Sequence, residues 1–429
     1  MTDTTRLTQT LDALADELQP TITQEMSDSR PKRRGTAKVQ KDEAVLQVVE
    51  RDGVLQVEEA EPGTPGRRRR RGMNAPAAQE EVKYERKFDR LDRSEIGAWL
   101  ERLDTKLTPD RGLRALGDGG FEPIAAVPKD GRLLLLIHGT FSESESFMKG
   151  FGGNPRGPDF LDWARGRYSR ILAFDHPTLS VSPVLNARAL ALLMHDTEAE
   201  IDVVCHSRGG LVTRWWLEVF DHAPPQKRRA VFVGSPLAGT GLASPANIRG
   251  SLGLLSNIGM ALGAASAAVP FLTVMTGLFR IVTSVTKLAA KTPAIDAAVA
   301  LVPGLAAQSR VGNNRELISL RQTPGELVGR YFAVKSNFES DKPGWKFWRY
   351  FRDIGDHAID ALSDLVFEGD NDLVVDTGSM IDLSDKLLIP SEQILDFGTT
   401  DEVHHTNYFA QAQTLDFFRE MLGADLRET

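Results

Sequence analysis

The stretch that most constrains this fold is IDVVCHSRGGLVTRWW, which spans residues 201–216. It opens with Ile201–Cys205, a short apolar run rich in β-branched residues that is typical of a buried strand. Apolar side chains at roughly helical spacing follow Gly209–Gly210 and indicate a helix. The chain must therefore turn sharply at Ser207, and the two glycines provide the small volume that such a turn needs. This layout predicts a nucleophile elbow, in which a serine hydroxyl is exposed where a strand of a parallel sheet passes into a helix.

Short apolar runs alternate with helical patterns along most of the chain. Strands are expected at 131–139, 170–177, 201–205, 228–236 and 329–338, with a last strand within 386–398. Helices are expected at 94–107, 182–196 and 406–422, with a further helical segment at 345–367. Because strands that alternate with helices form βαβ units, we predict an α/β fold with a mostly parallel central sheet flanked by helices.

Residues 1–81 differ in composition from the rest of the chain. The segments RPKRRGTAK and EPGTPGRRRRRGMNAPAAQEE are charged and rich in Pro, Gly and Ala, so they bury too little apolar surface to offset the cost of ordering. Between them, two alternating apolar runs flank Asp52 and Gly53, a strong signal for a β-hairpin at residues 44–60. We expect a largely disordered region at 1–81 that contains this hairpin and has an unknown partner, followed by one domain at 82–429.

A long uncharged segment interrupts the α/β pattern. No charged residue occurs between Arg249 and Arg280, and the segment is long enough to cross a bilayer. Pro270 and several glycines break it, however, and it lies between two strands of the sheet, which a membrane span would pull apart. A buried pair of helices and a lid with an apolar inner face are the alternatives to a membrane span. We favour an inserted helical cap or lid at about residues 243–325.

The overall composition narrows the class of protein and of partner. The chain has 429 residues, a formal net charge of -8 and a single cysteine, so an internal disulfide is excluded. The acidic balance argues against nucleic acid as a partner, and the lone cysteine favours a reducing compartment. The N-terminus has no secretory signal pattern. We expect a cytoplasmic protein, with peripheral membrane contact through the cap or Arg67–Arg71 as an open alternative to a solvated linker.

The residue types that together activate a serine occur in the chain order Ser, Asp, His. A serine hydroxyl needs a base, the base needs an orienting acid, and the developing oxyanion needs donors. Ser207 is the candidate nucleophile. Asp372, which precedes the apolar run Leu373–Val375, is the favoured acid, and Asp370 and Asp376 remain alternatives.

Two adjacent histidines, His404 and His405, are the candidates for the base. They lie between the last predicted strand and the last predicted helix, and their side chains point in different directions, so only one can reach Ser207. We favour His405. A metal pair is the rival interpretation, but further ligands at supporting spacing are missing from the sequence, and we expect neither a metal nor another cofactor.

Donors for an oxyanion are expected at the end of another strand. The run LLLLI ends at His138-Gly139, where the chain bends over the edge of the sheet. We expect the backbone N–H groups of Thr140 and of Arg208, the residue after the candidate nucleophile, to converge on the oxyanion. His138 is expected to bond to the loop backbone and not to act as the base.

Six segments together resemble a bacterial α/β-hydrolase of the lipase and esterase kind, namely LLIHGTFS, FDHPTLSVSPVLNA, VVCHSRGGLVTRW, VFVGSPLAGT, GDNDLVV and HHTNYF. Lipases of that kind carry an HG oxyanion turn, a nucleophile in G-H-S-x-G-G, an acid in an NDG-like loop and a late histidine. The resemblance implies an α/β-hydrolase fold with Ser207, Asp372 and His405 as the triad and with Thr140 and Arg208 as oxyanion donors.

The resemblance covers about residues 132–422, apart from the inserted apolar segment, and departs from the family pattern twice. Cys205 replaces the first glycine of the nucleophile motif, and Leu373 replaces the glycine after the acid. Neither change removes a catalytic group. The resemblance implies a serine hydrolase that cleaves carboxylic esters, often of acyl lipids, under a lid. A non-catalytic scaffold on a hydrolase fold, and an acyltransferase or amidase with the same triad, are the alternatives.

Overall fold

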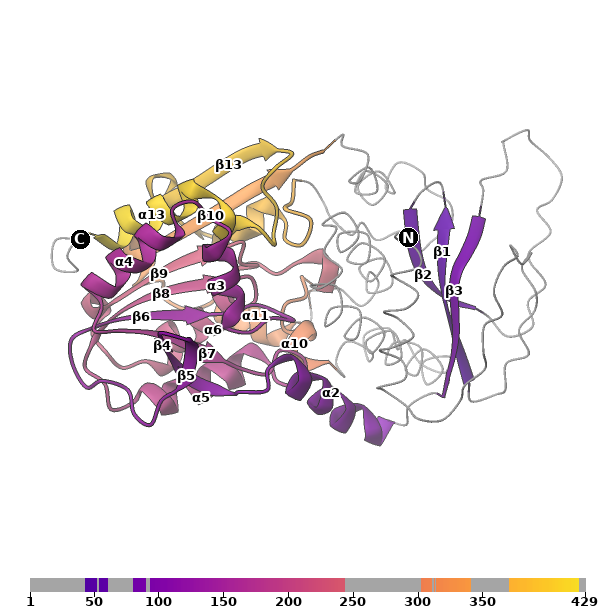
Figure 1. The fold of residues 1–429 in the computed structure, drawn as a ribbon, viewed down its shortest axis with the longest axis horizontal. Helices are drawn as coiled ribbons and strands as arrows, with labels where there is room; N and C mark the ends of the chain where they lie inside the picture. Colours follow the sequence, from indigo (N-terminus) through magenta and orange to yellow (C-terminus); the bar gives the residue numbers. More distant parts are fainter. Residues whose placement is uncertain are drawn as a thin grey trace. The chain divides into compact units, whose positions relative to one another are not determined.

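A computed structural model of the chain divides into two compact units, each described by itself (Figure 1). The described residues are 43–51, 54–60, 80–89, 93–243, 302–310, 312, 314–340 and 370–423. The smaller unit comprises residues 1–99, 245–301 and 341–366, and the main unit comprises residues 100–244, 302–340 and 367–429. The predicted segments at 249–280 and 345–367, and the arginine run Arg67–Arg71, lie outside the described residues.

The described part of the smaller unit consists of a three-stranded antiparallel sheet and of residues 93–99. β1 (Glu43–Arg51) pairs with β2 (Val54–Ala60), so the segment expected to form a hairpin consists of two paired strands. β3 (Glu80–Asp89) pairs with the other edge of β1. Since an isolated two-stranded hairpin is marginally stable in water, the third strand supplies pairing that the hairpin lacks. β3 crosses the expected domain boundary at 81–82, so residues 80–89 belong to this small sheet.

An eight-stranded sheet forms the centre of the main unit, in the order β13-β10-β9-β8-β6-β7-β4-β5. Its strands are β4 (Gly112–Gly117), β5 (Gly120–Pro123), β6 (Arg132–Ile137), β7 (Arg170–Asp175), β8 (Glu200–His206), β9 (Arg228–Val233), β10 (Tyr331–Phe338) and β13 (Ile394–Thr400). The strands from β13 to β7 in this order pair in parallel, while β4 is antiparallel to β7 and β5. The order of the strands reverses at β6, and ligands of open α/β sheets bind at the carboxyl ends of strands at such a switch point.

Helices cover both faces of this sheet. On one face lie α5 (Pro183–Met194), α6 (Gly209–Trp215) with its π-helical extension η1 (Trp216–Phe220), and α11 (Arg315–Leu320); on the other lie α3 (Glu145–Gly152), α4 (Gly157–Arg167) and α13 (Ala412–Gly423). Two further helices are α2 (Arg93–Leu107), whose residues 93–99 fall in the smaller unit, and α10 (Pro303–Ala306). A separate two-stranded sheet consists of β11 (Asp382–Ser384) and β12 (Leu387–Leu388).

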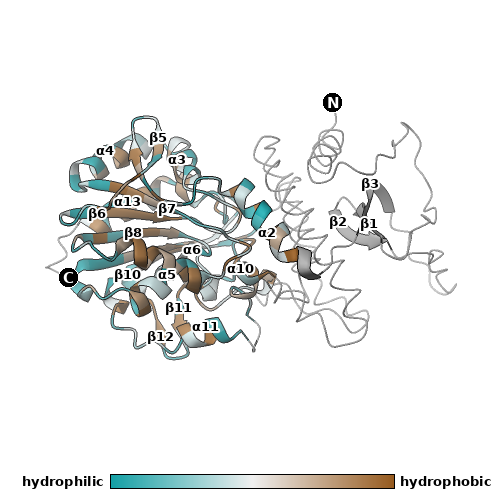
Figure 2. Ribbon diagram, turned by 90° about the horizontal axis from the view of Figure 1, so that it is seen from below, coloured by the Kyte–Doolittle hydropathy of each residue, from teal (hydrophilic) through white to brown (hydrophobic). Residues whose placement is uncertain are grey.

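Alternate side chains of each central strand enter different core clusters. Leu133 and Leu135 of β6 pack with residues of α5 and α6, whereas Leu134 and Leu136 pack with residues of α3, α4 and α13. Figure 2 shows the brown, apolar strands between α4 on one side and α5 on the other. Burial on both faces explains why these strands are continuous apolar runs in the sequence. The mostly parallel sheet with helices on both faces and a strand-turn-helix after β8 is the predicted α/β-hydrolase fold.

Two parts of the main unit differ from the sequence-based expectation. The apolar pattern predicts no strand between residues 107 and 131, yet β4 and β5 form a hairpin at the sheet edge. Most of their side chains are half-buried or exposed, so no apolar run marks them. The C-terminal part of the range expected to form an insertion, 243–325, belongs to the main unit, because α11 packs Leu317 and Leu320 into the core cluster that contains residues of α5 and α6.

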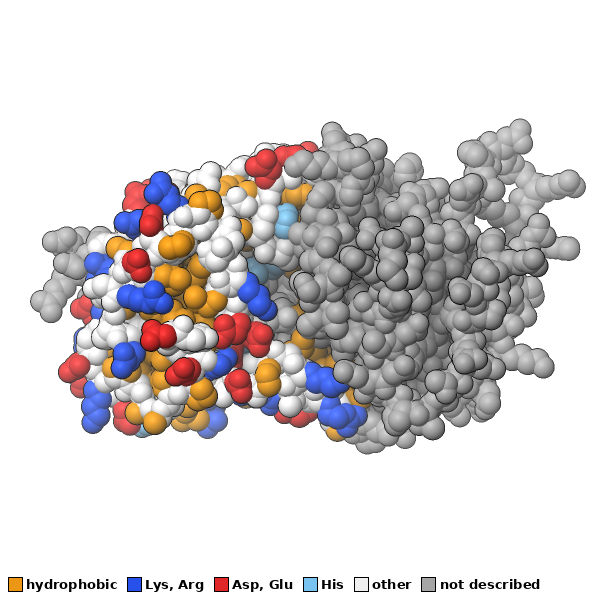
Figure 3. Space-filling view, viewed as in Figure 1, with side chains coloured by type: hydrophobic (Ala, Val, Ile, Leu, Met, Phe, Trp, Pro, Cys, Tyr) orange, Lys and Arg blue, Asp and Glu red, His pale blue; other side chains and the backbone are white. Residues whose placement is uncertain are grey.

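Charged and apolar side chains share the face of the main unit that Figure 3 shows. Acidic and basic side chains are interspersed with apolar ones on the face of the main unit in Figure 3. Within the described ranges, the helices are too short or too polar to cross a bilayer.

Candidate active site

Ser207 occupies the turn between β8 and α6, at the switch point of the sheet. Its φ of 53° lies in the left-handed region, which residues other than glycine rarely adopt. The Ser207 N–H donates to the carbonyl oxygen of Val233 at 2.9 Å, which ties the turn to β9. The strand, sharp turn and helix predicted from the sequence are therefore all present here, and the side chain is almost completely buried.

Left-handed backbone marks the whole candidate site. Within the described ranges, three residues other than glycine have a positive φ: Phe141 at 59°, Ser207 at 53° and Leu373 at 83°. Phe141 follows Thr140, and Leu373 follows Asp372. Backbone strain of this kind persists where the surrounding structure holds it and clusters at functional sites. The Leu373 conformation also explains why the resembled lipases carry glycine after the acid.

Gly139 brings the loop after β6 into contact with the turn at Ser207. A Cβ atom on Gly139 would lie 2.7 Å from the Cβ of Ser207 and 3.1 Å from the carbonyl oxygen of His206. No side chain fits at this distance, so glycine is required for the close approach. The predicted oxyanion loop therefore lies directly against the candidate nucleophile.

His405 and Asp372 form a hydrogen-bonded pair in the core of the main unit. The distance between His405 Nδ1 and Asp372 Oδ2 is 2.8 Å, and the His405 N–H donates to the Asp372 carbonyl oxygen at 3.0 Å. Both side chains are buried. The other carboxylate oxygen of Asp372 accepts the N–H groups of Val374 and Val375, at 3.1 and 2.8 Å. Asp372 thus lies in a tight turn that aims one oxygen at the imidazole.

The alternative acids and base lie elsewhere. Asp370 is exposed, and Asp376 Oδ2 lies 3.5 Å from Arg310 Nη2. His404 contacts Thr406 Oγ1 through Nδ1 at 3.1 Å and packs its ring edge-on against Phe338. Burial lowers the pKa of His404 to about 4. The structure therefore brings together Asp372 and His405, the favoured members of each set.

His206 links the candidate base to the turn that carries Ser207. Its Nε2–H donates to the His405 carbonyl oxygen at 2.9 Å, and the two rings lie 4.8 Å apart. Burial lowers the pKa of His206 to about 3, which keeps the ring neutral. Within the described residues, no hydrogen bond joins Ser207 to His405, so His206 provides the connection between these two segments.

The two predicted oxyanion donors keep their N–H groups available. Within the described part of the chain, the backbone N–H groups of Thr140 and Arg208 donate no hydrogen bond. His138 contacts the Gly139 carbonyl oxygen through Nδ1 at 2.9 Å, and His138 Nε2 accepts the N–H of His176 at 3.1 Å. The proton of His138 must therefore lie on Nδ1 and point at Gly139. Because a trans peptide sets C=O and N–H in opposite directions, this bond turns the Thr140 N–H away from His138.

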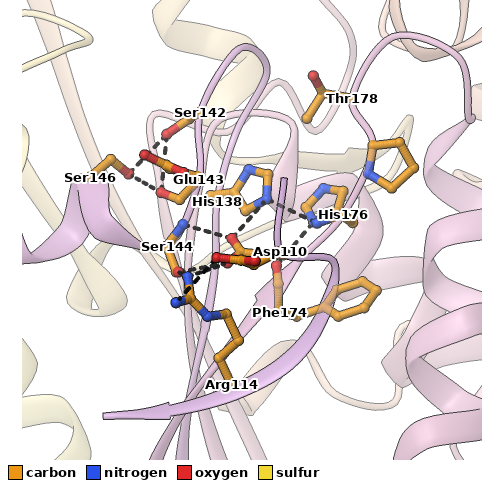
Figure 4. A network of polar contacts seen from close by, with 12 residues as sticks. Asp110, Arg114, His138, Ser142, Glu143, Ser144, Ser146, Phe174, His176 and Thr178 are labelled. Atoms are coloured by element: carbon orange, nitrogen blue, oxygen red, sulfur yellow. Dashed lines mark hydrogen bonds and ion pairs between the residues drawn. The ribbon is translucent and has the colours of Figure 1, made fainter. Parts of the chain in front are cut away.

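Figure 4 shows the polar network that holds this loop. Asp175 accepts the N–H and the hydroxyl of Ser144, both at 2.7 Å, and Arg114 Nη1 at 3.3 Å. The rings of His138 and His176 stack with centroids 4.1 Å apart. Burial lowers the pKa of both histidines. His138 is thus a neutral structural residue, in agreement with its expected role.

The side chain of Arg208 is buried and points toward main-chain carbonyls. Its Nε donates to Gly304 O at 3.3 Å and its Nη2 to Val181 O at 2.5 Å. Burial lowers its pKa to about 10, while the charges of Asp104 and Glu316 oppose that effect. The hydrogen bonds of the guanidinium thus connect the start of α6 to α10 and to the loop after β7.

Cys205, which replaces the first glycine of the nucleophile motif, is an inert buried thiol. Its Sγ lies 3.4 Å from the carbonyl oxygen of Val231, and burial raises its pKa to about 12. Since the thiolate is the reactive form of cysteine, this side chain is a packing residue of β8.

Sequence reasoning missed two residues of the site, His206 and Tyr408. Tyr408 donates its hydroxyl proton to Asp372 Oδ2 at 2.9 Å. Both lie inside segments that carry the family resemblance, His206 directly before Ser207 and Tyr408 three positions after His405. Their closeness to predicted site residues was the available signal, but their partners are distant in sequence.

Two lipases are among the solved structures that are similar to this chain. A lipase from Bacillus licheniformis in its mature form is 16% identical, with a TM-score of 0.40, over 72% of this chain and 97% of that one. Lipase 1 from Pelosinus fermentans is 13% identical, with a TM-score of 0.41, over 68% of this chain and 97% of that one. No curated protein matches the chain. The fold assignment rests on the sheet and the elbow described above.

A protein-family model matches residues 117–423, which run from the end of β4 to the end of α13. The matched range contains all the candidate site residues: Thr140, Ser207, Arg208, Asp370, Asp372, His404 and His405. The description of that family is a domain of unknown function, DUF7379. The chain belongs to the DUF7379 family.

Proposed function

We propose that this protein is a serine hydrolase that cleaves carboxylic esters through an acyl-enzyme. Ser207 is the nucleophile, His405 the base and Asp372 the acid that orients the base. The observation that carries the proposal is the 2.8 Å contact between His405 Nδ1 and Asp372 Oδ2, in a loop that His206 connects to the turn at Ser207.

The proposed reaction follows from the hydrogen bond between His405 and Asp372 and from the roles given to Ser207 and the oxyanion donors. Because Nδ1 of His405 bonds to the carboxylate, Nε2 is the nitrogen left to accept the Ser207 hydroxyl proton. The Ser207 oxygen then bonds to the ester carbonyl carbon, and the new oxyanion receives the N–H groups of Thr140 and Arg208. His405 returns the proton to the departing alkoxide, and a water molecule releases the acid by the same steps. The contact between Ser207 and His405 forms when substrate binds, since catalytic hydrogen bonds tighten in the complex.

An apolar acyl chain is the substrate class that we favour. The long uncharged segment at 249–280 enters the chain between β9 and β10, where an inserted cap would contribute apolar surface. An apolar surface binds longer acyl chains more tightly, because each buried methylene contributes roughly 0.8 kcal/mol.

The proposal is tested by labelling the purified protein with a fluorophosphonate and by measuring hydrolysis of p-nitrophenyl esters from acetate to laurate. We expect labelling that Ser207→Ala abolishes, and turnover that rises with chain length. Ser146→Ala, a half-buried serine on α3 with no role in the reaction, is the matched control and should label normally. A wild-type protein that is neither labelled nor active would refute the proposal. A competing alcohol that diverts the product to a new ester would instead identify an acyltransferase.

A further inference from the structure

Tyr408 shares the carboxylate oxygen that holds the candidate base. It lies at the start of the short helical turn η10 (Tyr408–Ala410) and is completely buried. Its hydroxyl oxygen is 2.9 Å from Asp372 Oδ2, and His405 Nδ1 is 2.8 Å from the same atom. One carboxylate oxygen therefore accepts two hydrogen bonds from the same loop.

The directions of these hydrogen bonds are determined by chemistry. An ionised carboxylate only accepts, so the tyrosine must donate its proton to Asp372. The Ser336 hydroxyl lies 2.8 Å from the Tyr408 hydroxyl and therefore donates to it. Burial raises the pKa of Tyr408 well above its usual value, so the proton stays on the phenol. With Val374 and Val375 on its other oxygen, the Asp372 carboxylate has two donors on each side.

Gly234 shows how tightly these groups are packed. Its φ is 54°, and a Cβ atom there would lie 2.8 Å from Tyr408 Cε2 and 3.2 Å from both Asp372 Oδ2 and His405 Nδ1. A side chain at this position would displace all three groups. Glycine at this position therefore allows the three groups to lie in close contact.

We infer that Tyr408 is a positioning residue that limits how strongly Asp372 stabilises the protonated form of His405, an inference that rests on the proposed function. The hydrogen bond from the tyrosine hydroxyl partly neutralises the negative charge on Asp372 Oδ2. The attraction between this oxygen and a protonated His405 is therefore weaker. Without the tyrosine hydroxyl, Oδ2 carries more negative charge and its hydrogen bond with His405 becomes stronger. The imidazolium is then favoured, and the base is lost to protonation at higher pH.

The other titratable groups around His405 and Asp372 do not obscure the effect of Tyr408 on His405. His206 faces His405 from the turn after β8, and His404 lies beside it in the same loop. Burial lowers their pKa values to about 3 and about 4, so both stay neutral in the range in which the base loses its proton. Tyr408 itself stays protonated there. The acidic limb of the rate profile therefore reports on the coupled His405 and Asp372 pair.

The test compares Tyr408→Phe with Tyr331→Phe. Tyr331 is equally buried and donates to the Glu218 carboxylate at 3.0 Å, on β10 and outside the proposed machinery. We expect the acidic limb of kcat/KM to move upward by about one pH unit in Tyr408→Phe, since a hydrogen bond to a charged group contributes a comparable free energy. Tyr331→Phe should leave it in place. An unmoved limb in an active Tyr408→Phe variant would overturn the inference.

A second measurement, by proton NMR, does not require the protein to have esterase activity. The low-field proton resonance of the His405 Nδ1–H, assigned by its loss in His405→Ala, should move further downfield in Tyr408→Phe because that bond strengthens. If the wild type has no esterase activity but this resonance moves, the proposed function fails and the positioning role stands. If the resonance stays, the positioning role fails. Should Tyr408→Phe not fold, Ser336→Ala weakens the tyrosine donor and should cause a smaller shift in the same direction, whereas no shift would count against the inference.

Discussion

Two pairs of histidines lie at or after the carboxyl ends of strands of the central sheet, and the surroundings of the two pairs differ. His138 and His176 stack on each other and bond to main-chain groups. His405, which lies 4.8 Å from His206, instead bonds to the carboxylate of Asp372.

The difference teaches what makes a buried histidine a base. Asp175 lies 3.5 Å from His138 Nε2, but it already accepts Ser144 and Arg114, and the Nε2 lone pair is taken by the His176 N–H. His138 therefore has no nitrogen left for a reacting group. In the second pair, the Asp372 carboxylate bonds to His405 Nδ1, which is the arrangement that the proposed base requires.

The largest effect on kcat is expected from a substitution of His405. His405→Ala removes the base, and kcat for ester hydrolysis should fall by about 10⁴-fold or more. His404→Ala is the matched control, because it changes the adjacent histidine without touching the bond to Asp372, and its kcat should stay within about threefold. Steady-state kinetics with a p-nitrophenyl ester measures both variants. Loss of activity in His404→Ala alone would assign the base to the other histidine.

A smaller effect is expected at His138, whose role is to orient a peptide. His138→Phe keeps the stack on His176 but removes the bond to the Gly139 carbonyl, so the Thr140 N–H is no longer aimed. We expect kcat to fall by about 10²-fold with little change in KM, because the oxyanion exists only in the transition state.

His176→Phe is the control for this variant, since its main-chain N–H is retained and still bonds to His138. Its kcat should remain within about threefold of the wild-type value. A rise in KM at constant kcat for His138→Phe would contradict the oxyanion role and indicate a role in substrate binding.

The smallest effect concerns the pH dependence of stability, to which His206 and His404 should contribute in the same way as His138 and His176. Burial lowers the pKa of His138, His176, His206 and His404, so these residues bind protons more tightly in the unfolded chain. Their contribution to stability is complete above the unfolded pKa of about 6.5 and is lost as the pH falls below it, down to about 4 for His404 and about 3 for His206. The free energy of unfolding should fall by up to about 1.4 kcal/mol per pH unit for each of them.

Urea denaturation at pH 7 and pH 5 measures this dependence. His206→Asn should reduce the difference between the two pH values, because one proton-binding site of the unfolded chain is gone. A wild-type stability that does not change between pH 7 and pH 5 would show that these histidines are not held neutral.

Much of the fold was predictable because its signals are local. β6, β7, β8 and β9 lie within apolar runs that mark buried strands, and they were expected at these positions. The hairpin of β4 and β5 was not, because it lies at the sheet edge and its half-exposed side chains carry no apolar pattern. The pairing that defines these edge strands comes from β7, which is distant in sequence.

The candidate site was predictable in part for the same reason. Ser207 stands out because its turn is encoded by the strand before it and the glycines after it. For the base, the sequence left two adjacent histidines, of which His405 was favoured over His404, and the roles of His206 and Tyr408 were missed. Each of these depends on a contact across the fold, such as that of His206 with His405, which are 199 positions apart.

The sequence by itself determined the turn at Ser207, because β-branched residues and glycines act on the backbone within a few positions. It also determined the two-sided burial of the central strands, since apolar runs without alternation have no face for solvent. Only the tertiary structure decided that Asp372 meets His405 and Tyr408 on one oxygen. Hydrogen bonds depend on distance and direction, and the fold alone places groups 33 and 36 residues apart at 2.8 and 2.9 Å.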